Sequence, residues 1–283
     1  MTPRDNGGVS LPDEPVNEPA HSQQPPQPAG ASEKPRTQRS EKSKPSVFWV
    51  LAGLLVPPGS LLARFRVINP QKMPRHGACI VAPNHYTEID PVMVGMVLWR
   101  LGRLPRFLAK ESLFRIPVFG WFLRRSGQVP VSRSGSARGS TTLAEAKKIV
   151  EDGRIVIVYP EGSLTRDPDM WPMRGKTGAA RMALEYGIPV IPMAHWGAQK
   201  VMARYAKKIS VFPRKTVAVR IGDPVDLSAF QGRPLDAATL TEATNAIMDA
   251  ITVLLEDLRG EKAPVTRWDP SAHNQKETGR FDG

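Results

Sequence analysis

The chain has 283 residues, a single cysteine and a formal net charge of +12 at pH 7. One cysteine excludes a disulfide framework within the chain, which fits a reducing compartment, and Cys79 is expected to be a small core residue. The excess of Lys and Arg indicates anionic partners, such as phospholipid surfaces, phosphorylated substrates or nucleic acid. No recognised nucleic-acid-binding motif accompanies these cations, so we expect no nucleic-acid partner.

Residues 1–45 are rich in Pro, Gln, Glu, Ser and Asn and contain few apolar positions. Such a segment cannot bury enough apolar surface to offset the entropy lost on ordering, so the sequence predicts a disordered tail. Its first residues lack the basic and then apolar organisation of a signal peptide. The polar segment 263–283 is predicted to be a flexible C-terminal tail.

Residues 46–65 form an apolar segment between the tail and the rest of the chain. The run 46–56 is shorter than the ~20 residues that a helix needs to cross a bilayer. Pro57, Pro58 and Gly59 follow it, and basic residues flank the segment on both sides. This pattern is similar to an interfacial hairpin that enters one leaflet, with its cations at the headgroups. A buried helix packed on the domain is the alternative.

From residue 66 to about 262, strand-like and helix-like patterns alternate. This alternation predicts one α/β domain, layered, with a largely parallel central sheet flanked by helices. Cys79 lies in one of the expected strands. The expected strands are residues 78–82, 106–109, 128–131, 155–159, 190–194, 209–212 and 216–221, and the expected helices are 91–101, 137–151, 176–186 and 237–258.

Two residues of possible acid–base chemistry follow the strand at 78–82. His85 comes directly after Asn84, and Asp90 stands five positions later, before Pro91. In a regular helix the two side chains would point about 140° apart, so they converge only if the helix begins near Asp90. Pro91 favours a helix start there, because proline suits the first helical position. The pattern then permits an imidazole oriented by a carboxylate, although Asp90 could also be an ordinary N-cap and His85 a loop residue.

A second polar run follows the strand at 155–159. Glu161, Gly162, Ser163, Thr165 and Arg166 come directly after Pro160, at the expected carboxyl end of that strand, where open parallel sheets bind ligands. Arg166 offers a planar fork for a phosphate. A helix-capping turn with a surface arginine is the alternative.

Two further sets of cations fall near turns. Arg174 and Lys176 open the expected helix at 176–186, and a helix N-terminus with cations favours anions. Arg133 follows Gly127 and the short strand at 128–131, and by itself would be taken as a surface residue. His76 and His195 have no partners at metal-ligand spacing, so no metal site is expected.

In sequence order, these runs resemble four blocks of the glycerolipid acyltransferase family, which is typified by 1-acylglycerol-3-phosphate acyltransferase. Asn84-His85-x4-Asp90 matches the His-x4-Asp block, and Gly127-x-x-Pro130-x-x-Arg133 is similar to the second. The run from Pro160 to Arg166 resembles the Pro-Glu-Gly-Thr-Arg block, and 188–192 resembles the fourth. The resemblance covers about residues 62–222.

The resemblance implies acyl transfer from acyl-CoA or acyl-carrier protein, as co-substrate and without a cofactor, to a lysophospholipid hydroxyl. His85 would be the general base and Asp90 its orienting group, while the acceptor would contact Asn84, Arg133, Glu161, Gly162, Ser163, Thr165, Arg166, Arg174 and Lys176. Two residues are inserted in the third block before Thr165, so Arg166 and Arg174 both remain open as the phosphate ligand. A peripheral or monotopic position on the cytoplasmic face of the cell membrane is expected.

The acceptor that we expect is 1-acyl-sn-glycerol-3-phosphate, which would be converted to phosphatidic acid. Another lysophospholipid or a glycolipid acceptor remains an alternative. So does a membrane-bound lipid-binding protein without catalysis, which the intact His85–Asp90 pair argues against.

Overall fold

The structure is a computed structural model that describes residue 41, residues 46–131 and residues 149–276. Apart from Glu41, the predicted disordered tail lies outside these residues. The predicted helix at 137–151 also falls mostly outside them, and only its end at 149–151 is seen as helix.

A largely parallel sheet forms the centre of the domain, as predicted. Five strands lie in the order β1-β7-β6-β2-β5, and only the β6–β7 pair is antiparallel. Strands β3 and β4 pair in parallel, and a bridge between Phe107 and Ile157 brings β3 beside β5. The strands are β1 (Ala63–Ile68), β2 (Cys79–Pro83), β3 (Leu108–Lys110), β4 (Val129–Val131), β5 (Ile155–Ile157), β6 (Val190–Trp196) and β7 (Lys215–Ile221).

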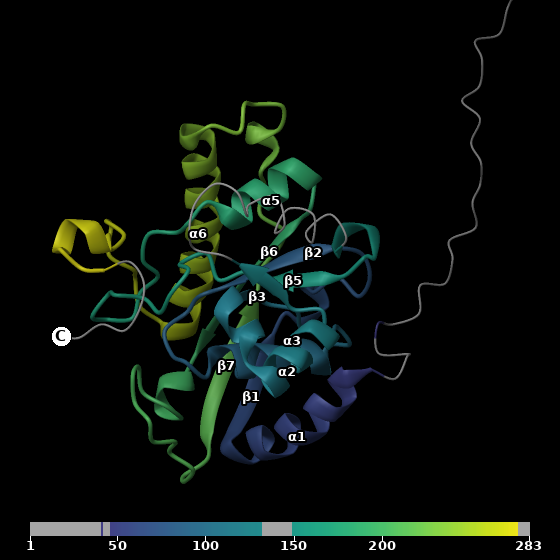
Figure 1. Cartoon of the computed structure of the whole chain (residues 1–283). Coiled ribbons are helices and arrows are strands. Elements are labelled where there is room, and N and C mark those ends of the chain that lie inside the picture. Colours follow the sequence, from purple (N-terminus) through teal and green to yellow (C-terminus); the bar gives the residue numbers. More distant parts are fainter. Residues whose placement is uncertain (1–40, 42–45, 132–148, 277–283) are drawn as a thin grey trace, which may run out of the picture. The chain divides into compact units, whose positions relative to one another are not determined.

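Helices cover both faces of the sheet (Figure 1). Side chains alternate across a strand. Cys79 and Val81 of β2 therefore pack in the cluster that contains α2, while Ile80 and Ala82 pack in the cluster that contains α5 and α6. Both faces of β2 are buried, which explains its continuous apolar sequence. The α-helices are α1 (Val47–Leu62), α2 (Asp90–Arg100), α3 (Pro117–Arg125), α5 (Gly178–Tyr186) and α6 (Ala237–Arg259).

The apolar segment 46–65 is not the expected hairpin. Residues Val47–Leu62 form one helix that continues through Pro57 and Pro58. Gly59 is buried against Met96 of α2, where a Cβ would collide with the methionine side chain. The glycine thus serves helix packing instead of a chain reversal. Strand β1 begins at Ala63 and pairs with β7, so the last residues of the predicted apolar segment, 63–65, belong to the sheet. None of the described helices is both long and apolar enough to cross a bilayer.

Two other predictions differ from the structure. Residues 209–212 form no strand, and Phe212 is 89% exposed. The predicted C-terminal tail, as far as residue 276, contacts the domain: the Trp268 carbonyl accepts a hydrogen bond from the Arg174 backbone N–H, and a short 3-10 helix covers Pro270–His273. The other 3-10 segments are Pro70–Lys72, Glu111–Arg115, Ala198–Lys200 and Ser228–Phe230.

The strand order creates a natural ligand site at the end of β2. Strands β5 and β6 lie on either side of β2 in the sheet. In the chain, however, β2 is followed first by α2, β3 and β4, and only then by β5 and β6. The path of the chain reverses direction across the sheet at this point. Open parallel sheets bind ligands at the carboxyl ends of the strands that flank such a reversal. His85 follows the carboxyl end of β2.

Candidate active site

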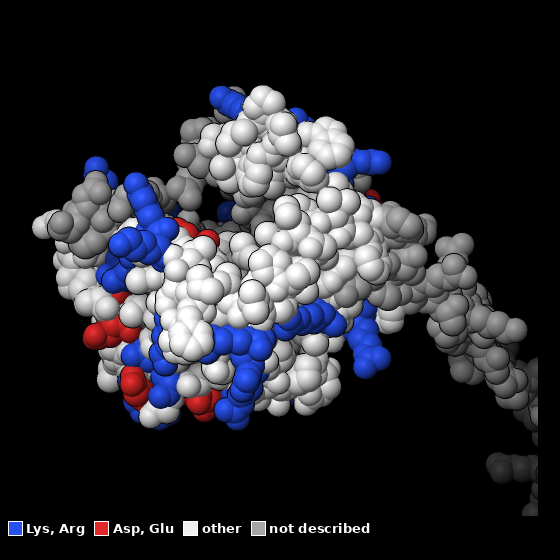
Figure 2. Space-filling model, turned by 90° about the horizontal axis from the view of Figure 1, so that it is seen from below, with Lys and Arg blue, Asp and Glu red and all other residues white. Residues whose placement is uncertain are grey.

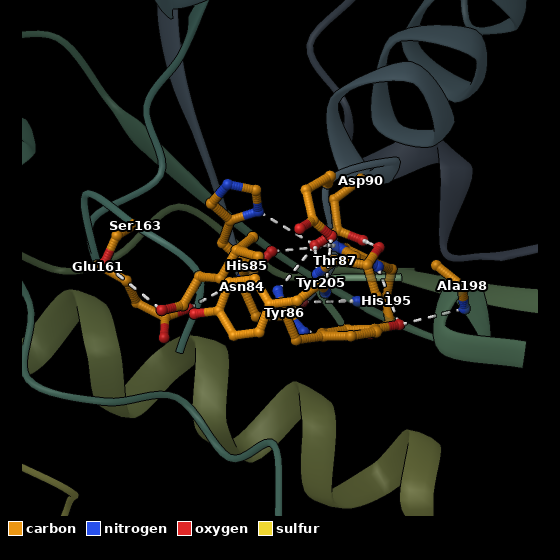
Figure 3. A network of polar contacts seen from close by, with 12 residues as sticks. Asn84, His85, Tyr86, Thr87, Asp90, Glu161, Ser163, His195, Ala198 and Tyr205 are labelled. Atoms are coloured by element: carbon orange, nitrogen blue, oxygen red, sulfur yellow. Dashed lines mark hydrogen bonds and ion pairs between the residues drawn. The ribbon is translucent and has the colours of Figure 1, made fainter. Parts of the chain in front are cut away.

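The carboxylate of Asp90 organises the segment between β2 and α2 (Figure 3). Asp90 is the first residue of α2, and its Oδ2 accepts hydrogen bonds from the backbone N–H groups of Tyr86 (2.7 Å) and Thr87 (2.8 Å). Its Oδ1 accepts a bond of 2.5 Å from the Thr87 hydroxyl. His85 Nδ1 lies 3.1 Å from Oδ2. The two side chains therefore converge, as the helix start at Pro91 had predicted.

Asp90 is fully buried yet stays ionised. Burial by itself would raise the pKa of Asp90, but the nearby His195 and the hydrogen bond from His85 hold it below its ordinary value. A carboxylate only accepts hydrogen bonds, so the Nδ1 of His85 must carry the proton at the 3.1 Å contact. In the neutral imidazole the other nitrogen, Nε2, is then an unprotonated base.

His195 of β6 lies beside Asp90, and it was not among the predicted site residues. The side chain is fully buried, and its Nε2 lies 2.9 Å from the carbonyl of Asn84 and 3.9 Å from Asp90 Oδ2. Because a carbonyl only accepts, Nε2 carries the proton. Nδ1 is then the acceptor for the hydroxyl of Tyr86 at 3.2 Å. Burial lowers the pKa of His195, although Asp90 opposes this effect.

Asn84 joins β2 to β6 by two backbone contacts. Its Oδ1 accepts from the backbone N–H of His195 at 2.9 Å, and its Nδ2 donates to the His195 carbonyl at 3.1 Å. The Asn84 side chain is 2% exposed, so these bonds are made in a desolvated environment. Asn84 was predicted to contact the acceptor substrate. In this structure its side chain instead holds the end of β2 against β6, directly before His85.

Glu161 connects the loop after β5 to the loop after β2. One carboxyl oxygen accepts from the backbone N–H of His85 at 2.8 Å, and the other accepts from Met173 N–H at 3.1 Å. The return contact is a 2.7 Å bond from the Thr165 backbone N–H to the carbonyl of His85. Burial raises the pKa of Glu161 to about 8, and the two backbone donors oppose this rise. Both Glu161 and Thr165 are buried.

The imidazole of His85 is held on its flat face as well. It stacks on the ring of Tyr159, with centroids 4.1 Å apart and planes inclined by 29°. The His85 side chain retains 16% exposure. The ring is therefore fixed in position by Asp90 and Tyr159 but still open to a substrate.

Gly162 shapes the turn beside Glu161. Its φ of +70° is a conformation that side chains disfavour, and an added Cβ would lie 3.0 Å from the aliphatic chain of Lys176. Lys176 itself is exposed and its backbone N–H donates to Pro160 at 2.7 Å. Ser163 is half-buried, and its hydroxyl donates to the Leu164 carbonyl at 3.4 Å. The two predicted residues Gly162 and Lys176 are thus brought together.

The two candidate phosphate-binding arginines have different surroundings. Arg166 is 4% exposed, and its guanidinium contacts the hydroxyl of Tyr205 and the carbonyl of Lys276. Arg174 has a half-exposed side chain that pairs with Asp269 at 3.5 Å. Arg133 lies outside the described residues.

With this geometry in place, the site can be described by its class: a histidine imidazole, held by a buried aspartate, at the carboxyl end of a strand in an α/β domain with a largely parallel sheet. Residues 64–196 match the family model described as Acyltransferase. The matched region contains His85, Asp90, Asn84 and Glu161, and this similarity agrees with the resemblance that the motif order had indicated.

Several curated proteins share sequence with the chain. It is 32% identical over 124 residues to the chloroplastic 1-acyl-sn-glycerol-3-phosphate acyltransferase BAT2 of Brassica napus, covering 44% of this chain and 34% of that protein. It is 26% identical over 204 residues to the 1-acyl-sn-glycerol-3-phosphate acyltransferase of Bacillus subtilis, covering 70% and 94%. The match to the human beta enzyme is 25% identical and spans 60% of its length. The chain therefore spans less than two thirds of some of these relatives.

A solved structure has a similar fold. The crystal structure of the 1-acyl-sn-glycerophosphate acyltransferase PlsC from Thermotoga maritima superposes with a TM-score of 0.53 at 22% identity, covering 77% of this chain and 83% of that one. This similarity supports the α/β architecture described above.

Proposed function

We propose that the protein transfers a fatty acyl group from acyl-CoA or acyl-carrier protein to the free hydroxyl of 1-acyl-sn-glycerol-3-phosphate, forming phosphatidic acid. The observation that carries this proposal is the 3.1 Å contact between His85 Nδ1 and the ionised Asp90, at the carboxyl end of β2. The names of the sequence relatives support the choice of acceptor.

In the proposed mechanism, His85 is a general base and then a general acid. Its Nε2 takes the proton of the acceptor hydroxyl as that oxygen attacks the thioester carbonyl. The tetrahedral intermediate then collapses, the carbon–sulfur bond breaks, and the leaving thiolate takes the proton from the imidazolium. The acceptor itself is the nucleophile, so no acyl-enzyme forms. The steps use only protein groups, and the absence of a cofactor remains a prediction.

The buried groups around His85 have positioning roles in this proposal. Asp90 fixes the tautomer and stabilises the imidazolium that forms during the attack. Glu161 holds the backbone of His85, and Asn84 holds the strand end before it. Because these three side chains are almost completely buried, contact with the lipid itself is left to other groups.

For the acceptor phosphate, we favour the exposed cations over Arg166. Lys176 lies over Gly162, beside the loop that carries Glu161, and Arg174 is half-exposed. Arg166 would have to leave its contacts with Tyr205 and Lys276 to reach a ligand, and so would lose hydrogen bonds made while almost fully buried. This choice rests on the proposed acceptor.

We also propose that the enzyme lies on a membrane surface, at the cytoplasmic face. The side of the molecule that carries α1 has a broad area without charged side chains, with Lys and Arg at its border (Figure 2). An apolar face with a basic border suits the interface of an anionic bilayer. Its exposed apolar side chains include Trp49, Val50, Leu54, Leu55 and Leu61 of α1, and Ile116, Val118, Phe119 and Trp121 at α3.

Substitution on α3 tests the membrane proposal. Val118→Ser/Trp121→Ser should weaken binding to phosphatidylcholine vesicles by at least about tenfold, since each side chain contributes on the order of 1.5 kcal/mol or more when buried. Val253→Ser removes an exposed valine from α6 and is the control. Equal vesicle binding by the α3 variant and the wild type, measured by flotation, would exclude α3 from the contact.

The function is tested by product analysis with purified protein, acyl-CoA or acyl-carrier protein, and a panel of lysophospholipids and glycolipids. Phosphatidic acid should be the main product. His85→Ala should reduce its formation by about 10²–10⁴-fold, the usual contribution of a general base. His76→Ala removes an exposed histidine outside the site and should leave the rate unchanged. Another acceptor would refute the substrate assignment, and turnover by His85→Ala at the wild-type rate would refute the mechanism.

A further inference from the structure

An arginine-rich cavity lies away from His85 and has no role in the proposed mechanism. Its volume is about 690 Å³, and five guanidinium groups contribute to its lining: Arg106, Arg115, Arg124, Arg125 and Arg154. Arg106, Gly127 and Arg154 stand at or just before the amino ends of β3, β4 and β5, whereas His85 follows the carboxyl end of β2. Tyr159, whose ring stacks on His85, stands five positions after Arg154, which is roughly 16 Å along a strand.

Arg106 is the buried part of this cavity. The residue is 6% exposed, and among the described residues its Nε has no hydrogen-bond partner. That nitrogen faces Gly127, where an added Cβ would lie 3.5 Å from it, so the glycine leaves the nitrogen uncovered by a side chain. Burial lowers the pKa of Arg106, and the positive charge of Arg154 lowers it further, while Glu41 opposes both effects. An anion in the cavity would relieve this repulsion.

The nearby carboxylates neutralise only part of the positive charge. Glu41 pairs with Arg106 at 3.3 Å and also with the buried Arg103 at 3.4 Å. Two further acids pair with lining arginines, Glu111 with Arg115 and Asp152 with Arg154. The five lining arginines thus exceed these three acids. Guanidinium groups match the geometry of phosphate oxygens, so phosphate is the anion that suits the cavity.

The surroundings of the cavity favour a lipid over a soluble phosphate. Phe48 of α1 and Phe114 line it together with the arginines. Trp49, next to Phe48, and Trp121, four residues before Arg125, are both about half-exposed, at 51% and 52%. An amphiphile with a phosphate headgroup would contact both kinds of side chain. We propose that the cavity binds the phosphate headgroup of an anionic membrane phospholipid, at a site separate from the His85–Asp90 site.

The test compares binding of the full chain to phosphatidylcholine vesicles with and without phosphatidylglycerol, which is neither the proposed acceptor nor its product. Arg125→Gln/Arg154→Gln removes two partly or fully exposed charges of the cavity. It should reduce the preference for phosphatidylglycerol by roughly 25-fold, at about fivefold for each charge near an anionic surface. Arg181→Gln/Arg233→Gln removes two exposed charges elsewhere and is the matched control. An equal loss in both variants would mean that only net charge matters, and would overturn the proposal.

Two further measurements separate the alternatives. The first is the melting temperature in inorganic phosphate. The lipid assignment would be overturned if phosphate raised the melting temperature of the wild type but not of the cavity variant, while the wild type showed no preference for phosphatidylglycerol. The cavity would then bind a soluble phosphate. Acyl transfer to dissolved lysophosphatidic acid should be unchanged in the cavity variant, and its loss would show that the cavity belongs to the catalytic site. Since vesicle binding is measured without turnover, the proposal stands or falls independently of the proposed function.

Discussion

Replacing Asp90 by Asn should remove the charge of the site while keeping its fold. Oδ2 accepts three hydrogen bonds, from His85 and from the backbone N–H groups of Tyr86 and Thr87, and the amide oxygen of Asn can take that position. The amide NH₂ then takes the position of Oδ1, which lies 2.5 Å from the Thr87 hydroxyl in the wild-type structure. There the NH₂ can donate a hydrogen bond, and the hydroxyl oxygen can accept it. We therefore expect a loss of only about 1–2 kcal/mol in the free energy of unfolding.

The catalytic effect should be much larger. Two unit charges about 4 Å apart attract by about 4 kcal/mol at an effective dielectric constant of about 20. This attraction is realised only when the imidazolium forms, so its loss raises the activation barrier. At about 1.4 kcal/mol per factor of ten, kcat should fall by about 10³-fold. KM should be nearly unchanged, because the fully buried Asp90 does not contact substrate.

The assay is steady-state acyl transfer to lysophosphatidic acid, with thermal melting of the same samples. Asp236→Asn is the matched control, since Asp236 caps α6 by accepting from the Thr239 backbone N–H and Asn is an equally good N-cap. The control should retain both activity and stability. A kcat for Asp90→Asn within tenfold of the wild type, in a folded protein, would refute the role given to Asp90.

Three other substitutions test the neighbouring contacts. The pKa of Glu161 is raised from 4.5 to about 8 in the folded protein. Between these two pH values the folded state therefore keeps a proton on Glu161 that the unfolded state has lost. The free energy of unfolding should fall as the pH rises through this range. Urea unfolding from pH 5 to 8 should show a smaller fall in the free energy of unfolding for Glu161→Gln than for the wild type. The same slope against pH in both proteins would contradict the raised pKa of Glu161. Asn84→Ala leaves the backbone N–H and carbonyl of His195 without the side-chain partners that Asn84 provides, and should cost about 2–5 kcal/mol in urea unfolding. A cost below about 1 kcal/mol would contradict the role given to Asn84 in joining β2 to β6. Gly162→Ala should raise KM for the acceptor, whereas Gly232→Ala, at a similar φ of +74° with open space around it, should affect stability alone.

Local chemistry explains why the central pair could be predicted from the sequence. His85, Asp90 and Pro91 lie within seven consecutive residues, and proline at the helix start turns the Asp90 side chain back toward His85. The strand before them is recognisable because both its faces are buried and its residues are continuously apolar. No distant part of the chain is needed for either inference.

Other features depended on partners that the sequence does not reveal. The run at 209–212 has the composition of a strand, but no neighbouring strand pairs with it. Pro57 and Pro58 suggest a chain reversal, yet the helix continues through both prolines. Gly59, which follows them, packs closely against Met96 of α2. In both places, tertiary contacts outweigh local preference.

The sequence by itself determined the alternation of strands and helices, the position of the motifs at strand ends and the convergence of His85 with Asp90, because each depends on short-range periodicity or on a single helix start. The strand order was decided only by the tertiary structure. Placing β2 between β5 and β6 brings Glu161 to the backbone of His85 and His195 to within 3.9 Å of Asp90. These contacts join residues 76 or more positions apart in the chain, and their register follows from packing of the whole sheet.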